Sequence, residues 1–150
     1  YTYKIKISGR TKHYINTFGE ELMINNAEKA IEIACQKTGA SVNEYTAGPV
    51  YMSDGKKGKH EWLIEFDEIP DNLEYFSELL DNALKSLNSD YEAKRYKNIT
   101  LDFPEVRVMK NGIFHAWLKK KGKLGGQHKV PRLANHRKYI QEIMELNKKL

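Results

Sequence analysis

The sequence predicts an α+β fold, an open mixed sheet with helices packed on it. Segments with strand periodicity and segments with helix periodicity are mixed along the chain, without the strict alternation of a doubly wound sheet. Two long strand-like runs also flank a short polar stretch, which is typical of a β-hairpin. A length of 150 residues predicts a single domain, long enough to bury a sizeable core. We therefore expect one domain, residues 1–150.

Two short strands are expected at the start of the chain. Lys4–Ser8 alternates as a strand and ends at the turn Gly9-Arg10, and His13–Phe18 forms a second short strand closed by Gly19. Because the chain starts directly in this strand pattern and without methionine, we expect it to be the C-terminal part of a longer protein.

The first helix is expected from Asn26 to just before Gly39. Glycine at that position suits the left-handed backbone that often ends a helix. The apolar residues that recur at helical spacing are Ala27, Ala30, Ile31 and Ala34.

A β-hairpin follows this helix. Its strands are expected to be Ser41–Ser53 and His60–Asp67, joined by the lysine-rich tip DGKKGK. In the second strand, Trp62, Ile64 and Phe66 are expected on one face, and Glu61 and Glu65 on the other.

The clearest helix begins at Pro70-Asp71. Asp71 is placed to cap it, with Glu74 three residues later as in a capping box. A shorter helical segment, Asp90–Lys97, follows Asn88-Ser89. The long helix carries an apolar stripe made of Leu73, Phe76, Leu80, Ala83, Leu84 and Leu87.

The last third of the chain predicts a strand and two helices. The strand is Glu105–Met109, a turn follows at Asn111-Gly112, the first helix is Ile113–Lys121, and the second starts at Asn135. The apolar positions that define the helices are Phe114, Trp117 and Leu118 in the first, and Tyr139, Ile140, Ile143 and Met144 in the second.

Composition narrows the function classes. The net charge of +5 favours anionic partners only modestly, because 20 acidic residues are interspersed among 25 basic ones. The single cysteine, Cys35, excludes an internal disulfide and fits a reducing compartment. No apolar run approaches the roughly 20 residues of a membrane span. We expect a cytoplasmic domain with no membrane partner.

Several familiar sites are not expected. The five histidines are too far apart for metal-ligand spacing, so no metal site is predicted. The two glycine-rich phosphate-binding motifs G-x-x-x-x-G-K-[ST] and G-x-G-x-x-G do not occur in the sequence. This chain therefore does not contain a self-sufficient nucleotide-binding loop. The lysine run 119–123 invites a nucleic-acid interpretation, but aromatic residues fall mostly at core-facing positions rather than among the lysines. We expect no nucleic-acid partner.

The most informative stretch is Gly125–Arg132, which reads GGQHKVPR. It places Lys129 on a glycine-rich loop with Pro131 behind it. An isolated lysine is ordinarily solvated surface. An ammonium on a loop that can approach a ligand closely is also suited to brief contact with an anion, and such a contact matters most where charge develops in a transition state.

A second informative stretch is GRTKHYINTFGEE, near the start. Arg10 and Lys12 in its turn are either solvated charges or part of a hinge, in which a few residues absorb the dihedral change of a domain rotation. Arg10 could also contact a nucleotide. The residues alone do not separate these interpretations.

These two stretches resemble a known family. The whole chain is similar to the C-terminal domain of the auxin-responsive-promoter family of acyl-acid amido synthetases, in the adenylate-forming superfamily, and to bacterial members more than to plant ones. The most specific parts are SLNSDYEAKRYKN and GKLGGQHKVPR. Gly9, Arg10, Lys12, Ile15 and Gly19 satisfy the superfamily's hinge pattern G-R-x-[D/K]-x-x-I-x-x-x-G in order.

The resemblance implies roles for individual residues. Lys12 would be the hinge residue, and Lys129 would match the late lysine that contacts ATP and the acyl carboxylate during adenylation. The residues expected near the nucleotide are Gly9, Arg10, Gln127 and Arg132. Two departures, Asn16 and Glu21 in place of basic residues frequent in coenzyme-A-dependent relatives, favour an amine acceptor over a thiol.

The implied activity is an ATP- and Mg²⁺-dependent ligase with two steps. A carboxylic acid and ATP would give an acyl-adenylate and pyrophosphate, and the amine of an amino acid would then attack the acyl carbon. A larger N-terminal domain would hold most of the substrates, and this domain would cap it and be inactive alone. The alternatives are a free-standing regulatory or binding module and, less favoured, a basic nucleic-acid-binding domain.

Overall fold

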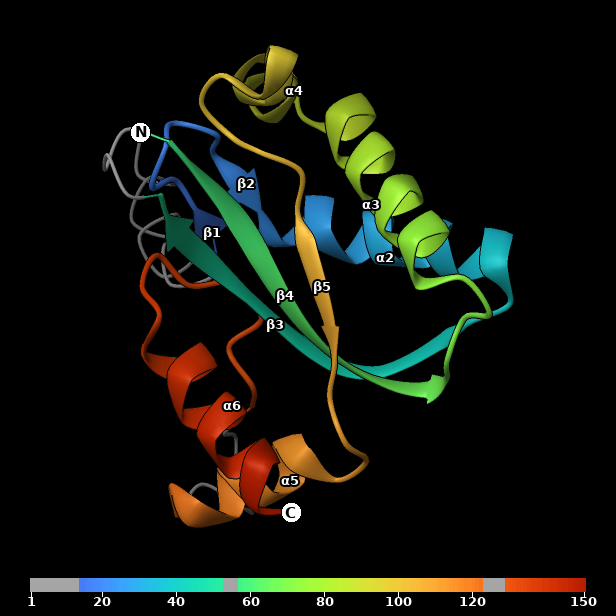
Figure 1. The fold of residues 1–150 in the computed structure, drawn as a ribbon, viewed down its shortest axis with the longest axis vertical. Helices are drawn as coiled ribbons and strands as arrows, with labels where there is room; N and C mark the ends of the chain where they lie inside the picture. Colours follow the sequence, from blue (N-terminus) through green and yellow to red (C-terminus); the bar gives the residue numbers. More distant parts are fainter. Residues whose placement is uncertain (1–13, 53–56, 123–128) are drawn as a thin grey trace, which may run out of the picture.

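A three-stranded mixed sheet forms the centre of the domain (Figure 1). The computed structural model describes residues 14–52, 57–122 and 129–150. Strands β3 (Ser41–Tyr51) and β4 (Gly58–Glu68) are antiparallel, and β5 (Glu105–Val108) pairs parallel to β4. The predicted open mixed sheet and the hairpin are confirmed. The predicted strand Lys4–Ser8 lies outside the described residues.

Helices cover both faces of this sheet. On one face, α2 (Ile24–Thr38) and α3 (Leu73–Leu87) share a core with alternate residues of β4, namely Trp62, Ile64 and Phe66. On the other face, α5 (Ile113–Lys120) and α6 (Lys138–Lys149) share a second core with Leu63. No helix in the described part of the chain is long and apolar enough to cross a membrane.

Glu61 and Glu65 of β4 lie on the second face as predicted, and both are buried there. Glu65 accepts hydrogen bonds from the Asn43 amide (2.8 Å) and from the Phe114 N–H (3.2 Å) in the first turn of α5. A carboxylate at this position stabilises the unpaired N–H groups and the dipole of a helix start. The glutamate therefore serves as a buried anchor for α5.

Glu61, the second of these glutamates, is neutralised by two arginines. It pairs with Arg107 of β5 and, at 2.9 Å, with Arg137 just before α6. Because an unpaired buried carboxylate is costly, these pairs explain how the charge is tolerated between the sheet and α6.

Three predicted helix starts need correction. The helix α2 begins at Ile24, two residues before Asn26, whose side-chain oxygen instead accepts the Met23 N–H (3.0 Å). The cap of α3 is Asn72, which accepts the Tyr75 N–H (3.0 Å), and not Asp71. The helix α6 begins at Lys138 rather than at Asn135. The predicted end of α2 is confirmed, since Gly39 has φ of 76°.

The segment after α3 holds a buried polar cluster. Helix α4 (Ser89–Arg95) continues into the 3₁₀ turn η2 (Tyr96–Asn98). Asp81 of α3 accepts two hydrogen bonds from Arg95 (2.8 and 2.6 Å) and one from the Tyr91 hydroxyl (2.6 Å). This cluster joins α4 to α3 through fully paired charges.

Candidate functional site

The segment that follows Lys129 lies along the open edge of the sheet. Leu133 pairs with Ala47 of β3 as a parallel bridge, and both are buried. Val130 is also buried, whereas Lys129 is exposed. The bonds to β3 run from Ala47 N–H to Arg132 O (2.9 Å), from Ala134 N–H to Ala47 O (3.1 Å), and from the Thr46 hydroxyl to Pro131 O (2.6 Å). Lys129 thus stands in solvent at the end of a segment fixed to the sheet.

Arg132 is held by acidic residues of this domain. Its Nε donates to Glu44 of β3 (2.8 Å) and its Nη1 to Glu28 of α2 (2.6 Å). Its guanidinium lies 5.1 Å from the centre of the Tyr45 ring, whose hydroxyl donates to Glu28. Burial, followed by this bond to Glu28, raises the pKa of Tyr45 well above its ordinary value, so the hydroxyl stays a neutral donor.

The described part of the second informative stretch, from Tyr14 onward, begins a two-stranded ribbon. Strand β1 (Tyr14–Ile15) pairs antiparallel with β2 (Leu22–Met23), a strand that the sequence did not reveal. Ile15 and Leu22 are fully buried, which fixes the ribbon on the core. Gly19 has φ of 86°, the left-handed backbone that suits a glycine at the turn.

A buried contact between a glutamate and a histidine also fixes this ribbon to β4. The Glu20 carboxylate lies 2.5 Å from His60 Nε2 and also accepts the Phe18 N–H (2.7 Å). Phe18 packs over Gly58, where an added Cβ would lie 2.1 Å from its ring, so no larger residue fits there without displacement. The ribbon therefore lies beside the start of β4 (Figure 1). The segment before α6 also lies near this end of the hairpin.

Asn135 joins the two stretches. Its side-chain oxygen accepts the Asn16 N–H (2.6 Å) and the Thr17 hydroxyl (3.2 Å), and its amide donates to the Tyr14 carbonyl (2.9 Å). These residues are 118 to 121 positions apart in the sequence. The structure thus brings the segment carrying Lys129 beside the ribbon that follows the predicted hinge.

The predicted site residues are only partly visible. Gly9, Arg10, Lys12 and Gln127 lie outside the described residues, whereas Lys129 and Arg132 lie within them. Sequence reasoning missed Asn135, because it interpreted that asparagine as a helix start. It also missed the acidic partners of Arg132, since nothing local marks two residues on different elements as neighbours.

The two positions that depart from the coenzyme-A-dependent pattern touch each other. The side-chain oxygen of Asn16 accepts the backbone N–H of Glu21 (3.1 Å), and Glu21 has a positive φ of 42°. This bond closes the ribbon turn. Asn16 thus has a local structural role, because its short polar side chain bonds the nearby backbone.

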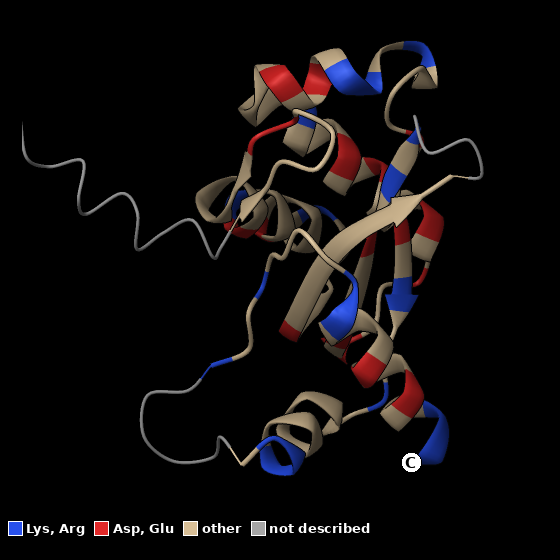
Figure 2. Ribbon diagram, turned by 90° about the vertical axis from the view of Figure 1, so that its left-hand side faces the viewer, with Lys and Arg blue, Asp and Glu red and all other residues tan. Residues whose placement is uncertain are grey.

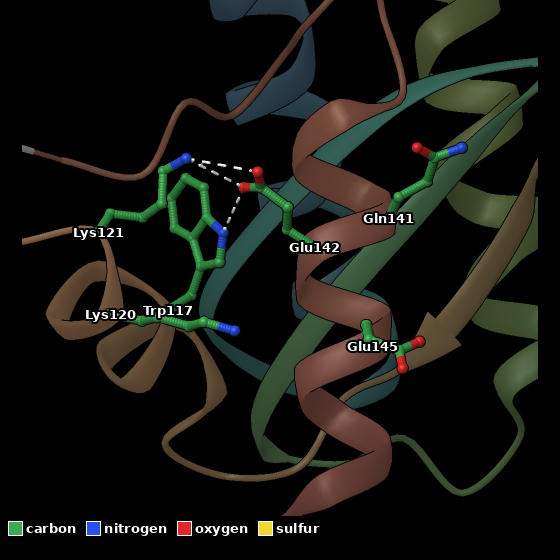
Figure 3. A pocket seen from close by; sticks show the side chains of 6 residues that line it. All are labelled: Trp117, Lys120, Lys121, Gln141, Glu142 and Glu145. Atoms are coloured by element: carbon green, nitrogen blue, oxygen red, sulfur yellow. Dashed lines mark hydrogen bonds and ion pairs between the residues drawn. The ribbon is translucent and has the colours of Figure 1, made fainter.

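A hollow lies between α5 and α6 (Figure 3). Two of its charged side chains pair with each other: Glu142 accepts the Trp117 indole N–H (3.0 Å) and lies 3.3 Å from the Lys121 ammonium. The residues that line it are Trp117, Lys120, Lys121, Gln141, Glu142 and Glu145. None of the predicted site residues that the structure describes, Lys129 and Arg132, lines this hollow.

Charge and metal-ligating groups are dispersed. Acidic and basic residues are interleaved along the helices and strands (Figure 2). Among the residues that the structure describes, no group of three or more histidine, cysteine, aspartate or glutamate side chains is placed to hold a metal ion.

Comparison with known proteins decides the family. The model of the GH3 family C-terminal domain matches residues 25–138, more than half of the chain. The chain belongs to the GH3 family. This confirms the family that the resemblance indicated, whereas the greater similarity to bacterial members stays a prediction. No curated protein matches the chain.

Two solved structures share the fold of this GH3 domain. One is the GH3.15 acyl acid amido synthetase, with 18% identity and a TM-score of 0.65 over 85% of this chain. The other is AtGH3.15 acyl acid amido synthetase in complex with 2,4-DB, with 16% identity and a TM-score of 0.69 over 89%. The chain spans about a quarter (25%) of the length of either protein.

Proposed function

We propose that this GH3 domain is the C-terminal cap of an ATP-dependent acyl-acid amido synthetase. In the first step, a carboxylate oxygen of the acid attacks the α-phosphorus of ATP and pyrophosphate leaves. In the second, the amine of an amino acid attacks the acyl carbon, AMP leaves and an amide forms. Family membership supports the reaction class, and the size of the two structural matches supports a larger N-terminal partner domain.

The observation that carries this proposal is the placement of Lys129. Its ammonium is exposed, yet the backbone behind it is fixed by three hydrogen bonds to β3 and by the buried Val130. A charge that is preorganised in this way stabilises developing negative charge without reorganising at the moment of reaction. We assign Lys129 to the triphosphate and the acid carboxylate during adenylation, in a cleft completed by the N-terminal domain.

The remaining predicted residues take supporting roles. Lys12 would be the hinge about which the domain turns between the steps, and Gly9, Arg10 and Gln127 would lie near the nucleotide. Arg132 would act near the nucleotide from its place beside Glu28 and Glu44, where it also fixes the segment that carries Lys129. Mg²⁺ would neutralise the triphosphate when bound, and we assign it no residue among those described.

The test is an assay of the full-length protein with ATP, Mg²⁺ and a panel of carboxylic acids. We expect exchange of labelled pyrophosphate into ATP that depends on the acid, and amide formation once an amino acid is added. Omitting the acid is the control. Absence of acid-dependent exchange across aromatic and aliphatic acids would overturn the proposed ligase activity.

A further inference from the structure

The described ribbon β1–β2 is fixed to the Lys129 segment by one side chain. Among residues 14–23 and 129–137, every hydrogen bond between the two passes through Asn135. Its oxygen accepts two hydrogen bonds, which uses both lone pairs, and its amide donates a third. Asn135 therefore sets how the ribbon is oriented against the Lys129 segment, while the buried Ile15 and Leu22 fix the ribbon on the core.

The backbone that carries Asn135 is itself rigid. The preceding residues, Leu133 and Ala134, are buried, and the Ala134 N–H is bonded to Ala47 O (3.1 Å). Three residues after Asn135, helix α6 begins, and it is anchored by the buried Ile140. The asparagine thus extends from the same fixed segment that presents Lys129.

The ribbon end that Asn135 holds is the end nearest the proposed hinge. Tyr14, whose carbonyl accepts the Asn135 amide, is two positions after Lys12 in the sequence. Any rotation at Lys12 is passed to the domain through residues 14–17, so their orientation relative to the Lys129 segment decides where the ammonium arrives. Misplacing a reacting group by about 1 Å can cost as much as about 10²-fold in rate.

We propose that Asn135 is a positioning residue, which fixes the chain leaving the hinge against the segment that delivers Lys129. This inference rests on the proposed function. It assigns Asn135 no contact with substrate. Its effect on the reaction passes entirely through the placement of the lysine.

The first test is kinetic and uses the full-length protein. Asn135→Ala should lower kcat for acid-dependent pyrophosphate exchange by about tenfold, with the KM for ATP unchanged within about twofold. The double variant Asn135→Ala/Lys129→Ala should be no slower than Lys129→Ala alone, because nothing remains to be positioned. Asn135→Asp, which keeps the acceptor but loses the amide donor to Tyr14, should recover part of the rate.

Asn147→Ala is the matched control. Asn147 also accepts a backbone N–H, that of Lys110 (2.9 Å), but from the far end of α6. The Asn147→Ala protein should catalyse acid-dependent pyrophosphate exchange at the rate of the unaltered protein. A rate loss in Asn147→Ala equal to that in Asn135→Ala would show that any lost asparagine contact is harmful, and would overturn the positioning role.

The second readout does not depend on activity. Hydrogen exchange of the full-length protein should show faster exchange in the peptide containing the Asn16 amide for Asn135→Ala and not for Asn147→Ala. Unchanged exchange there, full kcat in Asn135→Ala, or a loss that adds fully to that of Lys129→Ala would each overturn the inference. Full activity of Lys129→Ala would instead refute the catalytic role proposed for Lys129, and with it the idea that Asn135 positions this lysine. Hydrogen exchange at the Asn16 amide would still show whether Asn135 holds the ribbon.

Discussion

Arg132 and Glu44 form an ion pair at 2.8 Å that ties the segment behind Lys129 to β3. A second carboxylate, Glu28 of α2, holds the other side of the same guanidinium at 2.6 Å. The arginine thus joins three separate elements, the Lys129 segment, the sheet edge and α2. Since the side chain is about one-third exposed (34%), we expect this arrangement to order the segment more than to stabilise the fold.

Arg132→Ala should therefore reduce activity more than stability. We expect the free energy of unfolding to fall by about 1 kcal/mol, because solvent screens the lost ion pairs. Acid-dependent pyrophosphate exchange in the full-length protein should fall by at least about tenfold, as the lysine loses its fixed support. Urea unfolding and exchange assays on the same preparation separate the two effects. Loss of stability without loss of exchange would contradict this role.

Asp81→Asn should weaken the fold strongly. The substitution removes the charge that neutralises the buried Arg95, and breaking a buried pair from one side typically costs about 3–5 kcal/mol. Glu78→Gln is the matched control, since Glu78 is exposed on the same helix. Urea unfolding should show the loss for Asp81→Asn alone. Equal midpoints for the two variants would contradict the importance of the cluster.

The same cluster predicts a dependence of stability on pH. Burial alone would raise the pKa of Asp81, but hydrogen bonds from Arg95 and Tyr91 lower it below the ordinary value of 3.8. The stabilisation is therefore complete well above that value and is lost as the pH falls through the lowered pKa. The difference in unfolding free energy between Asp81→Asn and the unaltered protein should shrink from about pH 5 downward. A difference that grows on acidification would contradict this assignment.

Lys12→Pro should separate the two steps of the proposed reaction. Proline fixes φ and so restricts the rotation that a hinge must allow. We expect amide formation to fall more than pyrophosphate exchange when both are measured on the full-length protein. An equal loss in both steps would count against a hinge at Lys12.

Local sequence signals predicted most of the fold. The alternation in His60–Asp67 predicted which residues of β4 share a face, and Gly39 marked the end of α2. The pattern did not predict that Glu61 and Glu65 would be buried. Their burial depends on α5 and α6, which arrive from much later in the chain and supply Arg137 and the Phe114 N–H.

The site was predictable only where residue type and local context coincided. Lys129 stood out because glycines and a proline flank it. Asn135 did not, because an asparagine before a helical pattern ordinarily predicts a cap. Its tertiary use, 119 residues from Asn16, overrides that local preference and delays α6 to Lys138.

The most direct test of the account is the Lys129→Ala substitution in the full-length protein. Loss of one preorganised charge contact should slow acid-dependent pyrophosphate exchange by about 10²–10³-fold. The protein should unfold at the same urea concentration as before, because the side chain is exposed. Lys37→Ala, at an exposed lysine near the end of α2, should leave the rate unchanged. Undiminished exchange in a folded Lys129→Ala protein would contradict the central claim.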